Sequence, residues 1–289
     1  MVNESVEIRR FNMDSRYEQE VKKFGKKDAV IALCVLAVLM GVLVLVALVS
    51  ERATDFQSTI MDYALRIVLV GTAVTIVLVK KQGLASIGFH KDKLWPMLRF
   101  GLILILIFLV FGIVPGLIFG WEFNGMGAII PALLTTLFMA AGEDIFFVGY
   151  LQTRLYGLIK NNALAILAGA VFFALVHLPA AMILAAYPFG ALTGVFVWIL
   201  GHSFVVLIFR RHFSIITVII VHTLANFFSG GSIWSEFNIE YSLFYSGTVP
   251  ILSVLVVLVI LEIVRWRKAK KWTKEAKNEG VVSLSKSIE

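Results

Sequence analysis

Hydrophobic residues along this chain fall into long, nearly uncharged stretches separated by short polar ones. A membrane-spanning helix needs about 20 predominantly apolar residues. Eight stretches approach or reach that length: 29–50, 61–79, 100–120, 131–150, 163–178, 189–209, 213–228 and 248–264. The pattern therefore predicts an all-α polytopic membrane protein, folded as a bundle of eight transmembrane helices. The stretches 213–228 and 248–264 are the shortest for a complete crossing.

The distribution of basic residues supports the same topology. Cytoplasmic segments of membrane proteins are enriched in Lys and Arg. Of the 26 basic residues, all but Arg52 and Arg66 fall in the two terminal segments or in the loops after every second span. We therefore expect a multi-pass plasma-membrane protein with both termini in the cytoplasm. The net charge of +7 follows from this topology and from attraction to lipid headgroups. It argues for a bilayer partner and against nucleic acid.

Three regions are expected along the chain. Residues 1–28 form a polar cytoplasmic tail that is either a surface helix or disordered. Residues 29–264 form the transmembrane domain. Residues 265–289 form a basic cytoplasmic tail, either a helix lying on the membrane interface or a solvated flank. The single cysteine, Cys34, excludes an internal disulfide and a cysteine-cluster metal site.

A few polar residues interrupt the predicted spans. Glu143 and Asp144 are adjacent in 131–150, and a charged side chain near the bilayer centre costs roughly 2.5 kcal/mol or more. Such a pair must therefore have partners inside the protein. The other buried candidates are His177, His202, and the pair His222 and Asn226, which are four apart and so share one helical face.

Helical depth allows some of these residues to meet. If Pro131 is the first helical residue, Glu143 lies ~18 Å along its helix. His177 and His222 reach similar depths, in the middle third of a ~30 Å core. Neighbouring residues point about 100° apart on a helix. Only one acid can therefore face a shared centre, and we expect the other to act from its flank.

The chemistry of this set is that of hydrolysis. A carboxylate beside an imidazole can activate water, while an amide and a second imidazole can stabilise an oxyanion. Glu143, His177 and His222 would also suit a zinc ion with one open position. His202 is interpreted as packing or cavity lining. We expect His90 and His212 to be solvated at the membrane interfaces.

Two further features concern the regions around the spans. The Gly-punctuated segment from Gly83 to His90 predicts a turn leading back into the membrane. Asp62 and Arg66, four residues apart, predict a structural ion pair on one face of the second span.

The polar residues also form three motifs in order. The sequence runs from Glu143 through Asp144 to Gln152, from Phe173 to His177, and from His222 to Asn226. With the Ser86 to Phe89 segment, they resemble the CPBP family of intramembrane endopeptidases, also called the Abi or CAAX-protease family, whose motifs are EExxxR, FxxxH and HxxxN. The resemblance covers roughly residues 84–228.

The resemblance implies specific roles for these residues. Glu143 with His177 would activate water, His222 with Asn226 would hold the oxyanion, and Asp144 would support them. The substrate would be a small peptide or a membrane-proximal protein segment, cleaved at a site that opens toward the cytoplasm. Zinc is implied weakly, because a metal is not a settled feature of the family.

Two residues depart from the family pattern. Asp144 replaces the second Glu and Val148 replaces the Arg of the first motif, while Arg154, six residues later, is expected at the cytoplasmic interface. A second hypothesis is therefore a catalytically impaired membrane scaffold or bacteriocin-immunity protein of the same family. A third hypothesis is a proton-coupled carrier that uses the acidic pair. Inverted repeats with paired broken spans would favour it, and the sequence does not display them.

Overall fold

The computed structural model describes residues 15–50, 54–90, 124–178 and 190–229, together with a few single positions elsewhere. All regular structure in these ranges is helical. The predicted spans 100–120 and 248–264 and the tail 265–289 lie outside the described residues, apart from isolated positions. The elements are α1 (Ser15–Val21), α2 (Lys26–Ser50), α3 (Asp55–Val79), η1 (Leu84–Ile87), α5 (Met126–Asp144), η3 (Ile145–Gln152), α6 (Thr153–Leu155), α7 (Asn162–Val176), α9 (Gly190–His212) and α10 (Ile215–Ser229).

Four helical segments of the described chain are long and apolar enough to cross a membrane. They are Lys26–Val46, Thr59–Val79, Gly127–Leu155 and Gly194–His212, and the shorter apolar helices Asn162–Val176 and Ile215–Phe227 accompany them. Many of their large aliphatic side chains are exposed on the outside of the bundle, as lipid-facing residues are. The prediction of an all-α membrane protein is confirmed. The count of eight spans and the cytoplasmic side of the termini stay predictions.

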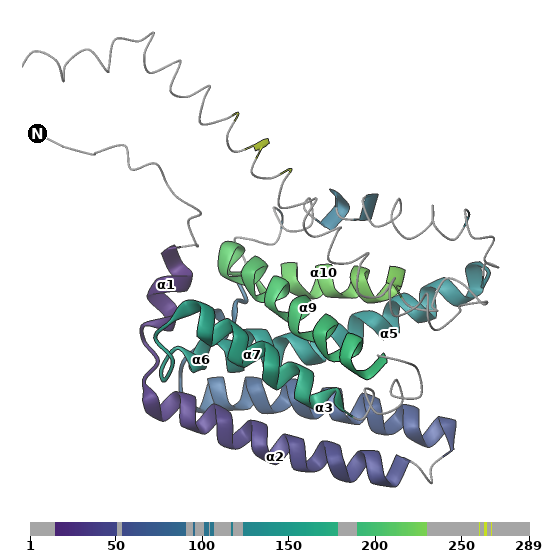
Figure 1. Cartoon of the computed structure of the whole chain (residues 1–289), viewed down its shortest axis with the longest axis horizontal. Helices are drawn as coiled ribbons and strands as arrows, with labels where there is room; N and C mark the ends of the chain where they lie inside the picture. The colour runs from purple at the N-terminus through teal and green to yellow at the C-terminus, as the bar shows by residue number, and fades with distance from the viewer. Residues whose placement is uncertain are drawn as a thin grey trace, which may run out of the picture.

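The bundle is arranged so that the predicted site lies at its centre. Figure 1 shows α2 and α3 side by side along one edge and α9 and α10 along the opposite edge. Helix α5 packs against both α3 and α10, and α7 packs against α9. Residues near the end of α5 can therefore contact α3, α7 and α10.

The start of the fourth span differs from the prediction. Helix α5 begins at Met126, after Gly125 with φ of 81°, and Pro131 lies inside the helix. The proline removes one backbone hydrogen bond close to the helix start, and membrane helices tolerate such a loss. Glu143 therefore lies about 25 Å along its helix rather than ~18 Å. The acid and His177 nevertheless meet, with Glu143 Oε1 3.8 Å from His177 Nε2.

A short 3₁₀ turn, η1, packs against the middle of the bundle, as the glycine pattern of residues 83–90 predicts. It is bounded by Gly83 and Gly88, with φ of 74° and 88°. At Gly88 a side chain would be strained, and its Cβ would also lie 2.9 Å from the backbone nitrogen of Ile215. That nitrogen donates to the Gly88 carbonyl at 3.0 Å. The glycine thus joins η1 to the start of α10.

Arg154 holds the same turn from the other side. Its guanidinium donates to the Ser86 hydroxyl at 2.9 Å and to the Gln82 side-chain oxygen at 2.6 Å. It also lies over the rings of Phe24 and Tyr150. Its side chain is only 1% exposed. Arg154 is therefore buried in the protein, where a backbone turn and ring faces replace the water that the charge would otherwise need, and its expected place at the cytoplasmic interface stays a prediction.

Helix α1 lies against the bundle through a buried ring. Its Tyr17 is 1% exposed and packs edge-on against Tyr156, Phe209 and Phe213, with ring centroids 5.5–6.1 Å apart. The described part of the polar tail thus forms a helix on the surface of the bundle, one of the two alternatives, with Tyr17 buried beneath it. The apolar gain from burying an aromatic ring fixes it against the bundle.

Candidate active site

Glu143 and Asp144 are the last two residues of α5, and the helix continues without a break into the π-helix η3. Both acids are buried, at 4% and 1% exposed. A π-helical segment widens the turn and changes the direction of the side chains that follow, and such segments recur at functional sites. All eight residues of η3 are buried. The acids therefore lie inside the protein, as their cost in a membrane requires.

The Glu143 carboxylate lies between two imidazoles. Its Oε1 is 3.8 Å from His177 Nε2 and its Oε2 is 3.9 Å from His222 Nε2. These residues come from α5, the end of α7 and α10. Both separations exceed a direct hydrogen bond, and such distances suit groups bridged by a small polar molecule. The three side chains, which the sequence allowed to share one site, therefore lie close together.

His177 is oriented by its own helix. Its Nδ1 lies 2.8 Å from the carbonyl of Phe173, one turn earlier. A carbonyl only accepts hydrogen bonds, so Nδ1 carries the proton, and in the neutral ring Nε2 is the acceptor. The ring also stacks on Trp198 at a centroid distance of 5.0 Å. The lone pair of His177 is thus directed toward the Glu143 side of the site.

Asp144 contacts His222 from the flank, as expected for the second acid. Its Oδ1 lies 3.1 Å from His222 Nδ1, so the imidazole donates to the carboxylate. This is the arrangement by which an acid orients a histidine in hydrolase triads. The other ring nitrogen, Nε2, faces Glu143. The shorter side chain of Asp144 therefore does reach His222.

Arg66 is the residue that sequence reasoning assigned only in part. Its Nη2 donates to Asp62 Oδ1 at 3.1 Å, which confirms the predicted ion pair. Its Nη1 also donates to Glu143 Oε1 at 2.6 Å. Gly142 permits this approach, since a Cβ there would lie 2.8 Å from Arg66 Cβ. One feature of the sequence could have indicated this contact: Arg66 lies inside an apolar span, whereas nearly all other basic residues lie in the terminal segments or in loops predicted to be cytoplasmic.

Aromatic rings form the wall behind the histidines. Phe173 stacks on His202 with centroids 4.6 Å apart and lies 4.5 Å from the His177 ring. His202 is 3% exposed, and its Nε2 has no hydrogen-bond partner among the described residues. This agrees with its interpretation as a packing residue. His90 is half-buried against Phe213 at 4.8 Å, so it is not the solvated residue expected.

Asn226 lies one turn after His222 on α10 and is half-buried. The shared helical face predicted from the spacing is therefore present. The structure places no hydrogen-bond partner for its amide among the described residues, so the amide stays a candidate rather than a positioned oxyanion donor.

The geometry does not fit the zinc site that the donor set suggested. Zinc ligand atoms lie about 2.0–2.2 Å from the ion. Glu143 Oε1, which would face such an ion, instead accepts the Arg66 guanidinium, a cation that would repel the metal. Within the described residues, no three His, Cys, Asp or Glu side chains form a group that could hold a metal ion. We therefore derive no step through a metal.

The segment that contains these acids and histidines matches a known protein family. Residues 125–228 match the Rce1-like family model. The description of that family is type II CAAX prenyl endopeptidase Rce1-like. The resemblance to the CAAX-protease family is thus confirmed, and the family indicates a protease embedded in a membrane. No curated protein is similar enough to the chain to count as a match.

The Rce1-like segment contains Glu143, Asp144, His177, His222 and Asn226. It does not contain Arg66 on α3, nor the η1 turn whose Ser86 to Phe89 residues contributed to the resemblance. The ion pair between Arg66 and Glu143 therefore joins a residue outside the Rce1-like segment to the central acid within it.

Proposed function

We propose that the chain is an intramembrane endopeptidase that hydrolyses a peptide bond in a small peptide or in a membrane-proximal protein segment. The observation that carries this proposal is the placement of Glu143 between the Nε2 atoms of His177 and His222, within a segment that matches a protease family. The site is buried among apolar helices, where charge stabilisation is stronger than in water.

The first step would be activation of water. A water molecule bonded to Glu143 and to the Nε2 lone pair of His177 loses a proton to this pair as its oxygen attacks the peptide carbonyl carbon. The tautomer fixed by the Phe173 carbonyl supports this role for His177. The C–N bond then breaks, and the leaving nitrogen takes up the proton from the same pair.

The second part of the site would stabilise the tetrahedral intermediate. An oxyanion needs N–H donors, and His222 Nε2 serves when it carries a proton while Nδ1 donates to Asp144. Asn226, on the same face of α10, would supply the second N–H from its amide. Arg66 would act as a positioning residue that holds the Glu143 carboxylate in place.

The substrate class is taken from the family, whose description names prenyl endopeptidases. We therefore propose to include farnesylated peptides with CAAX ends beside unmodified ones. Purified protein in detergent is incubated with this library, and products are identified by mass spectrometry. Cleavage is expected from the wild type and from the control Glu20→Gln. This control makes the same Glu-to-Gln change in α1, where Glu20 pairs with Lys23. Cleavage is expected to be absent from Glu143→Gln.

A second candidate function is a scaffold or immunity protein that keeps the fold without the chemistry. The observation that favours it is that Arg66 already pairs with Glu143, while Asp144 and Val148 depart from the family motif. This alternative expects Glu143→Gln to retain the cellular phenotype. Loss of both cleavage and phenotype in folded Glu143→Gln would reject it. No cleavage by the wild type, together with a phenotype kept by Glu143→Gln, would reject the peptidase.

A further inference from the structure

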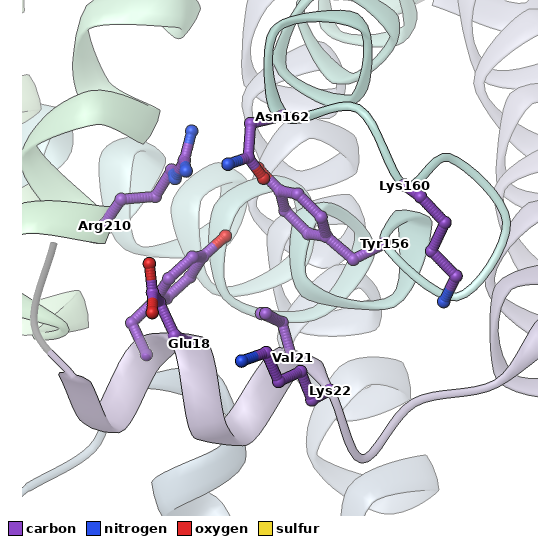
Figure 2. Close-up of a pocket in the computed structure, with 8 residues that line it drawn as sticks. Glu18, Val21, Lys22, Tyr156, Lys160, Asn162 and Arg210 are labelled. Carbon is purple, nitrogen blue, oxygen red and sulfur yellow. The ribbon is translucent and has the colours of Figure 1, made fainter.

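A cavity of about 290 Å³ lies away from the candidate active site, between α1, the turn after α6 and the end of α9. Lys22, Lys160 and Arg210 line it together with Tyr17 and Tyr156. Figure 2 shows side chains of these different elements around one space, with Arg210 and Lys160 on opposite sides. None of the acids, histidines or Asn226 of the active site lines this cavity. It is therefore a separate candidate binding site.

The inner wall of the cavity is a built arrangement of an arginine and two tyrosines. The Arg210 guanidinium lies 5.6 Å from the ring centroid of Tyr17 and 5.7 Å from that of Tyr156. The two tyrosine rings are themselves in edge-to-face contact at 6.1 Å. Arg210 is 6% exposed, so its position is set by the protein rather than by solvent. A guanidinium packed against two rings is held in place, and its planar N–H groups suit an anion such as phosphate.

The tyrosine hydroxyls are buried polar groups at this wall. Tyr17 and Tyr156 are 1% and 5% exposed, and their hydroxyls interact with each other, while that of Tyr156 also interacts with Gln152. Burial raises the pKa of Tyr17 well above its ordinary value, so it keeps its proton and remains a donor. A charged acceptor bound in the cavity would offer such a hydroxyl a stronger hydrogen bond than a neutral partner does.

The charge of the cavity selects the class of ligand. Lys22, Lys160 and Arg210 outnumber Glu18, the acid in the lining. Asn162 adds an amide at the start of α7. Three cations with hydroxyl and amide donors match a group that carries several charged oxygens in a small volume, and arginine binds phosphate oxygens in pairs.

The position of the cavity suggests where such a group would come from. Helix α2 begins at Lys26 and α7 at Asn162, while α9 ends at His212. The cavity therefore lies at one end of the membrane-spanning helices, the level at which lipid headgroups meet a protein. Basic pockets at this level bind the headgroups of anionic lipids.

We propose that this cavity binds a phosphate group, carried either by the headgroup of an anionic lipid or by a soluble phosphate compound. Arg210 and the two phenols hold the phosphate oxygens at the inner wall, and Lys22 and Lys160 neutralise it at the rim. The site is independent of the hydrolytic one, so Glu143→Gln binds the ligand as the wild type does.

The test uses the delipidated full chain in neutral detergent. Bound ligand is measured by native mass spectrometry and by the shift in melting temperature. The probes are phosphatidylglycerol, diacylglycerol with the same acyl chains, and inorganic phosphate. We expect saturable binding of phosphatidylglycerol or of phosphate, with diacylglycerol binding at least about tenfold more weakly. If the natural ligand is a lipid headgroup, the protein binds phosphatidylglycerol but not inorganic phosphate. If it is a soluble phosphate compound, the protein binds both probes with similar affinity.

Variants separate a built site from general attraction between charges. Lys160→Gln changes an exposed rim residue, and Tyr156→Phe removes one hydroxyl, so both variants are expected to fold. Each is expected to weaken binding by about tenfold. Lys23→Gln is the matched control, since it removes the same charge from a neighbouring residue paired with Glu20. Equal losses in Lys160→Gln and Lys23→Gln, equal binding of diacylglycerol, or no binding of either phosphate probe would overturn the proposal.

Discussion

Arg66 Nη1 lies 2.6 Å from Glu143 Oε1, and this ion pair joins α3 to the last turn of α5. The side chains are 13% and 5% exposed, so the pair is largely shielded from solvent. Removing one partner of a buried pair leaves an uncompensated charge. Arg66 therefore acts on the position of Glu143 and on the stability of the helix contact together.

The first prediction concerns Arg66 as a positioning residue. In Arg66→Gln the carboxylate loses a charged hydrogen bond worth about 1.5–3 kcal/mol, so we expect kcat to fall by about 10–100-fold with little change in KM. Arg66→Lys should recover part of that loss, because it restores the charge without the planar fork. Cleavage kinetics of the three proteins measure this. A loss confined to folded yield, with unchanged kcat in the surviving protein, would show that Arg66 is only structural.

The second prediction concerns the hydrogen bond from His222 to Asp144. Asp144→Asn keeps the size of the side chain but removes its charge, so the orientation and protonation of His222 are no longer controlled. We expect kcat to fall by about 10–100-fold. Asp144→Glu, which restores the family residue, should retain more activity than Asp144→Asn because it keeps a carboxylate. The reverse order would indicate that packing of this 1% exposed residue, rather than its charge, decides activity.

The third prediction uses Gly142 to test the close contact of α3 and α5. In Gly142→Ala the new Cβ would lie 2.8 Å from Arg66 Cβ and 3.0 Å from Arg66 Cδ, so the helices must move apart. We expect a destabilisation of about 1–3 kcal/mol, the usual cost of overpacking. Thermal unfolding in detergent measures it.

The control for Gly142 is Gly71→Ala on α3, where the structure places nothing within 4 Å of a new Cβ. This variant should be neutral or slightly stabilising because alanine favours a helix. If the two variants melt at the same temperature, the contact between Gly142 and Arg66 is not tight in the membrane protein.

The fourth prediction concerns Arg154. It donates to Ser86 and Gln82 and thereby fixes η1 against the bundle. Arg154→Gln leaves these acceptors unpaired, so we expect a destabilisation of about 3 kcal/mol or more, seen as loss of folded protein. Arg154→Lys should not rescue it, since one ammonium cannot replace the guanidinium fork. Lys26→Gln, at an exposed position, should fold normally. Normal melting of Arg154→Gln would contradict this role.

The fifth prediction concerns metal. Because the guanidinium of Arg66 faces Glu143, we expect cleavage to survive dialysis against a strong chelator, with no zinc found in the purified protein by elemental analysis. Activity that is lost on chelation and restored by zinc would contradict this. It would show that, in the active enzyme, Arg66 no longer pairs with Glu143 and that Glu143, His177 and His222 move closer together around the metal.

The sequence determined the elements and the candidate residues. Apolar length predicts the helices, because a span must be long enough to satisfy its own backbone in lipid. The costly acids Glu143 and Asp144 within an apolar run predict partners, and helical spacing pairs His222 with Asn226. These inferences depend on local periodicity and on the cost of burying charge, both of which are readable from one segment at a time.

Only the tertiary structure decided which partner each charge has. Arg66 and Glu143 are 77 positions apart, and nothing in the spacing of either helix says that α3 and α5 touch at Gly142. For the same reason the burial of Arg154 and of Tyr17 could not be read from the sequence. A charge or ring within an apolar segment implies only that it needs a partner. The packing of helices that are distant in the sequence determines which residue is that partner.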